Sequence, residues 1–108
     1  MKRSKPSVAA DVVVFEDLKV DRVQRRVYRA DKQVTVGPTE FKLIDFLIKN
    51  PKRVYSREQL LNSVWGDDIY VESRTIDVHI RRLRKAINID GKKDLIRTVR
   101  SAGYSLDA

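Results

Sequence analysis

The chain of 108 residues contains no cysteine and a single histidine, and these scarcities exclude several kinds of chemistry. Without cysteine there is no disulfide framework and no thiolate metal site. The histidine, His79, has no second histidine or acidic residue at metal-ligand spacing, so we expect no metal site. The sequence also offers no glycine-rich phosphate loop and no nucleophile–base pair. We therefore expect a protein that is not an enzyme and that needs no cofactor.

Long apolar runs are missing as well. No run approaches the roughly 20 residues of a membrane span, and no apolar stretch typical of a secretory signal follows the basic start. A cytoplasmic protein is the expectation. A hydrophobic content of 42% suffices for one compact domain, and 108 residues are too few for two. We expect a flexible tail at residues 1–10 and one domain at residues 11–108.

Negative charge is in short supply. The chain has 23 lysines and arginines against 15 acidic residues, a net charge of +8. Residues 74–100 hold nine basic and three acidic side chains, and therefore carry +6 of that total. An excess of this size points to nucleic acid, an acidic partner or an anionic membrane surface.

The most informative segment is residues 73–87, which has helical periodicity. Ile80, Leu83 and Ile87 fall within roughly 40° of Ile76 on a helical wheel, and the four so form one narrow apolar stripe. The opposite face carries Arg74, Val78, Arg81, Arg82 and Lys85, and only Asp77 interrupts the positive charge. A basic face with a bare apolar residue is typical of a helix that enters the DNA major groove.

The remaining elements follow from periodicity and capping signals. We predict an antiparallel sheet of three or four strands at residues 12–15, 18–20, 26–29 and 33–36. Pro38 suits the first position of a helix at 39–49, and Ser56 with Gln59 forms a capping box before a helix at 56–65 that Gly66 ends. A hairpin is predicted at 95–100 and 104–106. This order predicts an α+β fold, namely a winged helix-turn-helix with an N-terminal antiparallel sheet, three helices and a C-terminal β-hairpin wing.

Five motifs in this order resemble the DNA-binding effector domain of OmpR/PhoB-type response regulators. They are Gly37–Leu43, Val54–Leu61, Val64–Gly66, Arg74–Lys85, and Ile96–Arg100 together with Gly103 and Tyr104. The resemblance covers residues 11–106. It implies sequence-specific binding of double-stranded DNA and transcriptional regulation of a phosphate-regulon-like, activating kind. It also implies a two-component system, in which a cognate histidine kinase acts on a receiver domain absent from this chain.

The resemblance implies roles for individual residues. Base contacts are expected from Asp77, Val78 and Arg82 in the major groove and from Arg100 in the minor groove. Phosphate contacts are expected from Trp65, Arg74, Thr75, His79, Arg81, Arg84, Thr98 and Tyr104. The chemistry agrees, because arginine can donate two hydrogen bonds to guanine, a carboxylate can accept from cytosine, and an aliphatic group can pack on a thymine methyl.

Partners are implied in the same way. The loop at 66–73 is expected to contact the sigma subunit of RNA polymerase, through Glu58, Gly66, Val71 and Glu72. Two copies are expected to bind direct repeats as a head-to-tail homodimer, and the free domain is expected to be a monomer.

Each role has a structural alternative. The arginines could form an ordinary solvated helix face, Arg84 could make a structural ion pair, and Asp77 could pair with Arg81 four residues on. Trp65 could be core as well as contact, Thr98 and Tyr104 could serve only hairpin packing, and the loop could be a plain surface connection. For the whole domain, the alternative is a winged-helix protein-interaction module without specific DNA binding. Structured RNA is disfavoured, because its deep, narrow major groove would exclude the helix.

Overall fold

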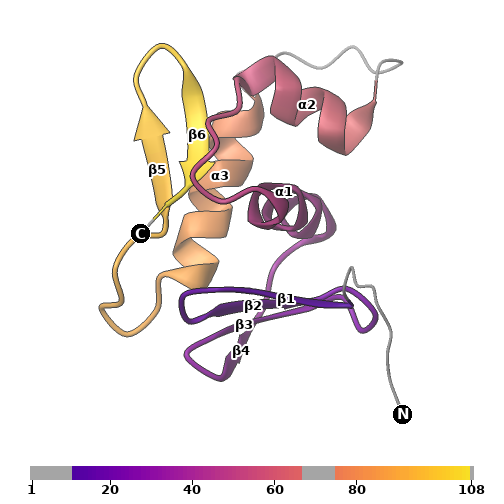
Figure 1. The fold of residues 1–108 in the computed structure, drawn as a ribbon, viewed down its shortest axis with the longest axis vertical. Coiled ribbons are helices and arrows are strands. Elements are labelled where there is room, and N and C mark those ends of the chain that lie inside the picture. Colours follow the sequence, from indigo (N-terminus) through magenta and orange to yellow (C-terminus); the bar gives the residue numbers. More distant parts are fainter. Residues whose placement is uncertain (1–10, 67–74, 108) are drawn as a thin grey trace.

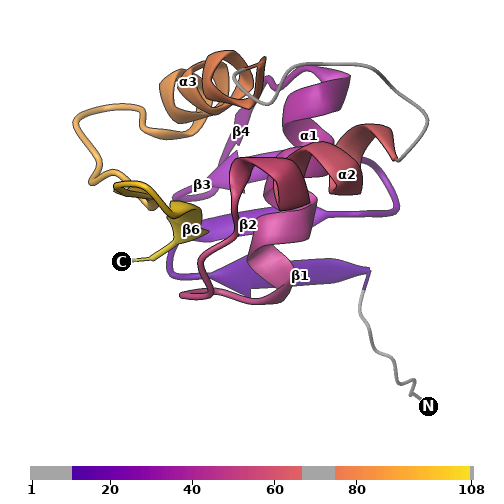
Figure 2. The same cartoon turned by 90° about the horizontal axis from the view of Figure 1, so that it is seen from above.

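The computed structural model describes residues 11–66 and 75–107 (Figure 1). A four-stranded sheet lies at one end, α1 lies between the sheet and α2, and a two-stranded hairpin lies beside α3. Figure 2 shows α1 and α2 crossing above the sheet, with α3 and the hairpin displaced to one side. The predicted winged helix-turn-helix architecture is confirmed. The predicted tail at 1–10 lies outside the described residues.

The N-terminal sheet is a simple antiparallel meander. Its strands β1 (Val12–Phe15), β2 (Leu18–Asp21), β3 (Arg26–Arg29) and β4 (Lys32–Val34) pair in sequence order. The fourth strand begins one residue earlier than predicted and ends at 34 rather than 36. Ala30 and Asp31 between β3 and β4 both have positive φ angles, 50° and 67°. This backbone matches the twist of a hairpin, so the turn forms without an Asn-Gly pair.

The helices begin and end where the capping signals predicted. Pro38 is the first residue of α1 (Pro38–Lys49), and Ser56 with Gln59 forms a complete capping box before α2 (Arg57–Trp65). Gly66 ends α2 with a φ of 81°. The third helix, α3, is described over Thr75–Ile87, so the start predicted at residue 73 lies outside the described residues. No helix in the described part of the chain is long and apolar enough to cross a membrane.

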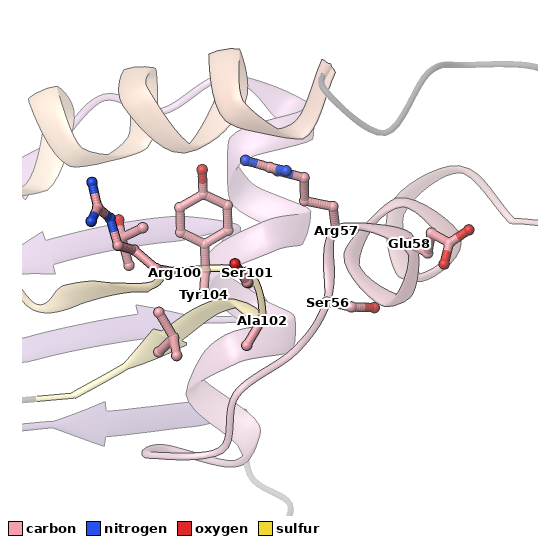
Figure 3. Close-up of a pocket in the computed structure, with 10 residues that line it drawn as sticks. Ser56, Arg57, Glu58, Arg100, Ser101, Ala102 and Tyr104 are labelled. Atoms are coloured by element: carbon pink, nitrogen blue, oxygen red, sulfur yellow. The ribbon is translucent and has the colours of Figure 1, made fainter.

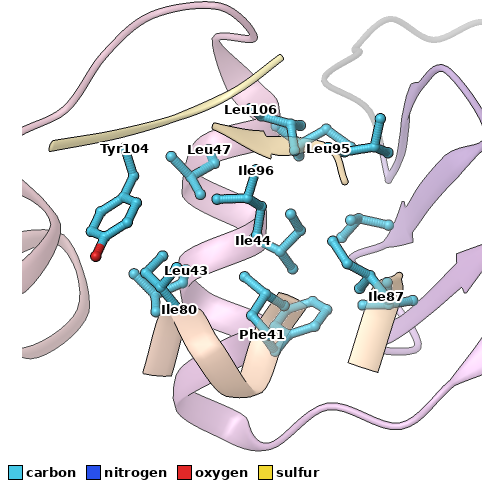
Figure 4. Close-up of a cluster of buried hydrophobic side chains, with 14 of the residues drawn as sticks. Phe41, Leu43, Ile44, Leu47, Ile80, Ile87, Leu95, Ile96, Tyr104 and Leu106 are labelled. Atoms are coloured by element: carbon cyan, nitrogen blue, oxygen red, sulfur yellow. The ribbon is translucent and has the colours of Figure 1, made fainter. Parts of the chain in front are cut away.

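The apolar stripe of α3 is the centre of the core. Ile76, Ile80, Leu83 and Ile87 are at most 1% exposed, as their spacing predicted. They belong to one cluster with Leu43, Ile44 and Leu47 of α1 and with Leu95, Ile96 and Leu106 at the hairpin (Figure 4). Because this stripe is buried on two sides, the opposite face of α3 must point to solvent.

The hairpin is held by the segment that joins α1 to α2, an arrangement that the sequence did not predict. Strands β5 (Ile96–Val99) and β6 (Gly103–Leu106) pair with each other, and Tyr55 exchanges two backbone hydrogen bonds with Tyr104, of 2.8 and 2.9 Å. Gly103 has a φ of 136°, and a Cβ there would collide with the backbone of Tyr55. The hairpin therefore gains a third backbone partner that fixes its position.

One buried arginine connects the sheet to the C-terminal end of α3. Arg29 is 2% exposed, and its guanidinium donates to Asp17 at 2.7 Å, to the carbonyl of Ile87 at 2.8 Å and to the carbonyl of Lys93 at 2.7 Å. The Ile87 carbonyl is one of those that a helix leaves without a partner inside the helix. A positive group at a helix C-terminus also interacts favourably with the helix dipole.

Replacing Arg29 by alanine should destabilise the domain by about 3 kcal/mol, because it leaves the buried carbonyl of Ile87, the carbonyl of Lys93 and the Asp17 carboxylate without their donor. Urea unfolding followed by circular dichroism measures this change. Arg26→Ala, on the exposed side of the same strand, is the matched control and should change stability by less than about 0.5 kcal/mol. Equal unfolding midpoints for the two variants would contradict this role of Arg29.

Candidate nucleic-acid interface

The outer face of α3 presents a basic surface around one apolar side chain. Val78 is 42% exposed, and Arg81, Arg82 and Lys85 are exposed along the same helix. Thr75 is partly exposed at the first described residue of α3, and Arg74 lies outside the described residues. Arginine is suited to both guanine edges and phosphates, and an exposed valine is suited to a thymine methyl.

Asp77 is bound by two other elements. Its Oδ1 accepts a hydrogen bond from Arg57 Nε of α2 at 2.9 Å and another from the Tyr104 hydroxyl of β6 at 2.5 Å. The alternative expectation was that Asp77 pairs with Arg81, but in the structure its partner is Arg57. The hydrogen bond to Asp77 and the charge of its carboxylate raise the pKa of Arg57. Burial, followed by the hydrogen bond to Asp77, raises the pKa of Tyr104.

The side chains predicted on the hairpin have internal contacts. Tyr104 is 6% exposed, so its ring serves hairpin packing, the alternative considered for this residue. Its hydroxyl donates a hydrogen bond to Asp77. Thr98 is exposed, and its Oγ1 accepts from Arg84 Nη2 at 2.5 Å. Arg100 is exposed at the start of the wing turn. Thr98 and Arg100 therefore remain accessible to a ligand, whereas Tyr104 exposes little surface.

Arg84 joins α3 to the hairpin. Its Nη2 also donates to the carbonyl of Ile96 at 2.8 Å, and its Nε lies 3.3 Å from Asp94 Oδ2. The structural ion pair considered for this residue is present. These contacts explain why an arginine borders the buried stripe, and they commit part of its guanidinium to holding the wing.

His79 does have an acidic partner, supplied by another helix. Its Nδ1 lies 2.5 Å from Glu40 Oε2, although the two residues are 39 positions apart, so inspection of nearby positions could not find the pair. This contact between Nδ1 and the carboxylate links α3 to α1. The Trp65 ring lies beside the imidazole, with 5.4 Å between centroids, and packs partly against the core.

A groove separates the first turn of α2 from the wing. It encloses about 390 Å³ and is lined by Ser56, Arg57, Glu58 and residues 98–104 (Figure 3). Figure 3 shows the Arg57 and Tyr104 side chains directed towards α3, with Glu58 turned away from the Arg57 guanidinium. Glu58 and Gly66, two of the predicted polymerase contacts, are exposed. The other two, Val71 and Glu72, lie outside the described residues.

An exposed basic helix braced by a β-hairpin defines the class of winged-helix DNA-binding domains. Residues 31–106 match the family described as "Transcriptional regulatory protein, C terminal". The chain belongs to this family, and specifically to the DNA-binding domains of OmpR/PhoB response regulators. These are DNA-binding transcription regulators of two-component systems and are not enzymes.

Particular relatives agree with this assignment. The chain is 52% identical, over all its 108 residues, to the phosphate regulon transcriptional regulatory protein PhoB of Rhizobium meliloti (strain 1021), of which it covers 48%. The solved response regulator DrrB, a Thermotoga maritima OmpR/PhoB homolog, matches 91% of the chain and is itself covered to 45%, with a TM-score of 0.78 and 33% identity. The AdeR DNA-binding domain, solved in complex with an intercistronic region, matches 87% of this chain and is covered to 97%, with a TM-score of 0.79 and 31% identity. The chain spans about half the length of the curated relatives it matches.

Proposed function

We propose that this domain binds duplex DNA sequence-specifically, with α3 in the major groove and the wing in an adjacent minor groove. The supporting observation is the division of α3 into a fully buried apolar stripe and an exposed face that carries Val78, Arg81 and Arg82. Arg82 donates to guanine and Val78 packs on a thymine methyl. Arg100 of the wing enters the minor groove, whose negative potential attracts arginine. Asp77 was predicted to accept from cytosine, but its Oδ1 already accepts from two side chains.

The phosphate contacts surround this reading face. Arg81 supplies an exposed charge. Nδ1 of His79 is paired with Glu40, so a phosphate contact falls to Nε2, which donates alongside Nδ1 only when the ring carries both protons. The other donors proposed are Trp65 through its indole N–H, Arg74, Thr75 and Thr98, with Arg84 and Tyr104 acting chiefly by holding the wing. Such contacts fix the register on DNA and supply most of the salt-dependent affinity.

The finer biological role rests on similarity to PhoB proteins. We propose activation of phosphate-regulon-type promoters through the sigma subunit of RNA polymerase, contacted by Glu58, Gly66, Val71 and Glu72. Two copies bind direct repeats head to tail, and the free domain is a monomer. A cognate histidine kinase acts on a receiver domain of the whole regulator. Because its target is DNA, the protein acts in the cytoplasm.

Arg82→Ala should weaken binding to a phosphate-regulon-type direct-repeat duplex by about 1–3 kcal/mol and reduce the preference over a scrambled duplex, since it removes a base contact. Arg81→Ala should weaken both duplexes alike and lower the salt slope by about one, since it removes a phosphate contact. Fluorescence anisotropy across a salt series measures both effects.

Arg26→Ala, which removes one exposed charge from the sheet, is the control and should leave both affinities and the salt slope nearly unchanged. If the unsubstituted domain does not distinguish the duplexes, phosphate-regulon-type specificity is wrong. If it binds neither duplex, the basic face serves another partner, such as a protein.

Glu58→Ala in the full regulator should reduce transcription from a direct-repeat promoter while DNA affinity stays unchanged, because the carboxylate is exposed and turned away from the Arg57 guanidinium. In vitro transcription with sigma-containing polymerase, paired with anisotropy, separates the two activities. Glu16→Ala, which removes an acid from the β1–β2 turn, is the matched control. Equal transcript yields from Glu58→Ala and Glu16→Ala would contradict the polymerase contact.

A further inference from the structure

We infer that Asp77 acts as a positioning residue for Arg57, and that Arg57 contacts the DNA backbone at the groove between α2 and the wing. This inference rests on the proposed DNA binding and deepens it. Arg57 lies within the motif Val54–Leu61, but no DNA contact was expected from it, and its pairing with Asp77, 20 residues further along the sequence, is visible only in the structure.

Asp77 is the meeting point of three elements that surround the proposed DNA-binding face. One carboxylate oxygen, Oδ1, accepts from Arg57 at the first position of α2 and from the Tyr104 hydroxyl of β6. Backbone bonds to Tyr55 hold the main chain of Tyr104, and its ring, only 6% exposed, is held by packing, so the hydroxyl is a well-placed donor. The carboxylate is therefore oriented by the wing and in turn orients Arg57.

This geometry disfavours Asp77 as a free reader of cytosine. A carboxylate next to DNA is repelled by phosphates, and pairing with Arg57 offsets that charge. Reading a base through Oδ1 would require breaking one of two charge-assisted hydrogen bonds, and reading it through Oδ2 would have to fit the orientation that those two bonds impose on the carboxylate. An Asp77 that stays paired has its principal effect on where Arg57 lies.

Arg57 is arranged to reach an anion. Its side chain is 54% exposed, and the bond to Asp77 uses Nε, only one of the five N–H donors of a guanidinium. The terminal amino groups remain suited to a phosphate, which guanidinium binds in a bidentate manner. Arg57 lines the same groove of about 390 Å³ as Arg100, and Figure 3 shows both side chains directed to the α3 side of that groove. A DNA strand that runs past the wing would meet both positive groups.

The test is a double-mutant cycle in DNA affinity, with Arg57→Ala, Asp77→Ala and the combined variant measured on the direct-repeat and scrambled duplexes. We expect Arg57→Ala to weaken both duplexes alike, by roughly three- to tenfold, and to lower the salt slope by about one. In the domain that keeps Arg57, Asp77→Ala should lower DNA affinity by less than Arg57→Ala does. In the Arg57→Ala variant, adding Asp77→Ala should lower the affinity no further. A panel of single-base-pair substitutions in the duplex should give the same preference with and without Asp77.

Three controls separate positioning from general destabilisation. Thermal unfolding shows whether each variant is folded at the titration temperature. Asp94→Ala removes an acid that pairs with a different arginine, Arg84 of α3, and should not couple to Arg57. Tyr104→Phe keeps the ring and removes only the hydroxyl, so its loss of affinity should also disappear in the Arg57→Ala background.

The inference is overturned if Arg57→Ala leaves affinity and salt slope unchanged. It is also overturned if Asp77→Ala relaxes the preference at one base pair whether or not Arg57 is present, since Asp77 is then a base reader. A failure of the proposed function is distinguishable, because the unsubstituted domain itself would then not prefer the direct repeat. Coupling between Arg57 and Asp77 on the scrambled duplex would still decide the inference in that case.

Discussion

The burial of one apolar stripe of α3 is the constraint on which the exposed face of that helix depends. Ile76, Ile80, Leu83 and Ile87 pack on α1 and the hairpin and lose almost all contact with solvent. The helix can rotate about its axis only by exposing these side chains, and fully exposing a single one would cost roughly 1.5–3 kcal/mol. The same burial therefore directs Val78, Arg81 and Arg82 outward. Core packing and the proposed base recognition are two consequences of one sequence period.

Polar contacts fix the position of α3 where apolar packing alone would not. At its C-terminal end, Arg29 bonds the Ile87 carbonyl and links the helix to the sheet. In its middle, His79 bonds Glu40 of α1, and near its start Asp77 bonds Arg57 of α2. Hydrogen bonds and ion pairs depend on direction and distance more than apolar contacts do, so these links define one pose of the helix. The exposed arginines are thereby presented on a rigid support.

Much of the fold could be predicted from local sequence signals. The stripe of α3, the capping box at Ser56 and the glycine that ends α2 all depend on residues within a few positions of one another, and all are present. The partners of Arg29, His79 and Asp77 could not be predicted, because they lie 12 to 64 positions away and are set by packing.

The wing shows the same difference. Its two strands were predicted from the sequence, but the backbone pairing of Tyr55 with Tyr104, which joins the hairpin to the segment between α1 and α2, was not. For the site, helical periodicity identified the outward face of α3. It could not show that the polar groups of Arg84 and Tyr104 form hydrogen bonds within the domain. Arg84 and Tyr104 lie at the border between core and surface. Sequence spacing alone cannot show whether a polar group there bonds to the protein itself or remains free for DNA.

The central claim is that the outer face of α3, together with the wing, is where DNA binds. The most direct measurement is a map of backbone amide chemical shifts for the domain titrated with a duplex that holds one half-site. The account predicts the largest changes at Val78, Arg81, Arg82 and the wing turn near Arg100, with little change on the outer face of the four-stranded sheet. Changes centred on that sheet, with α3 unaffected, would contradict it.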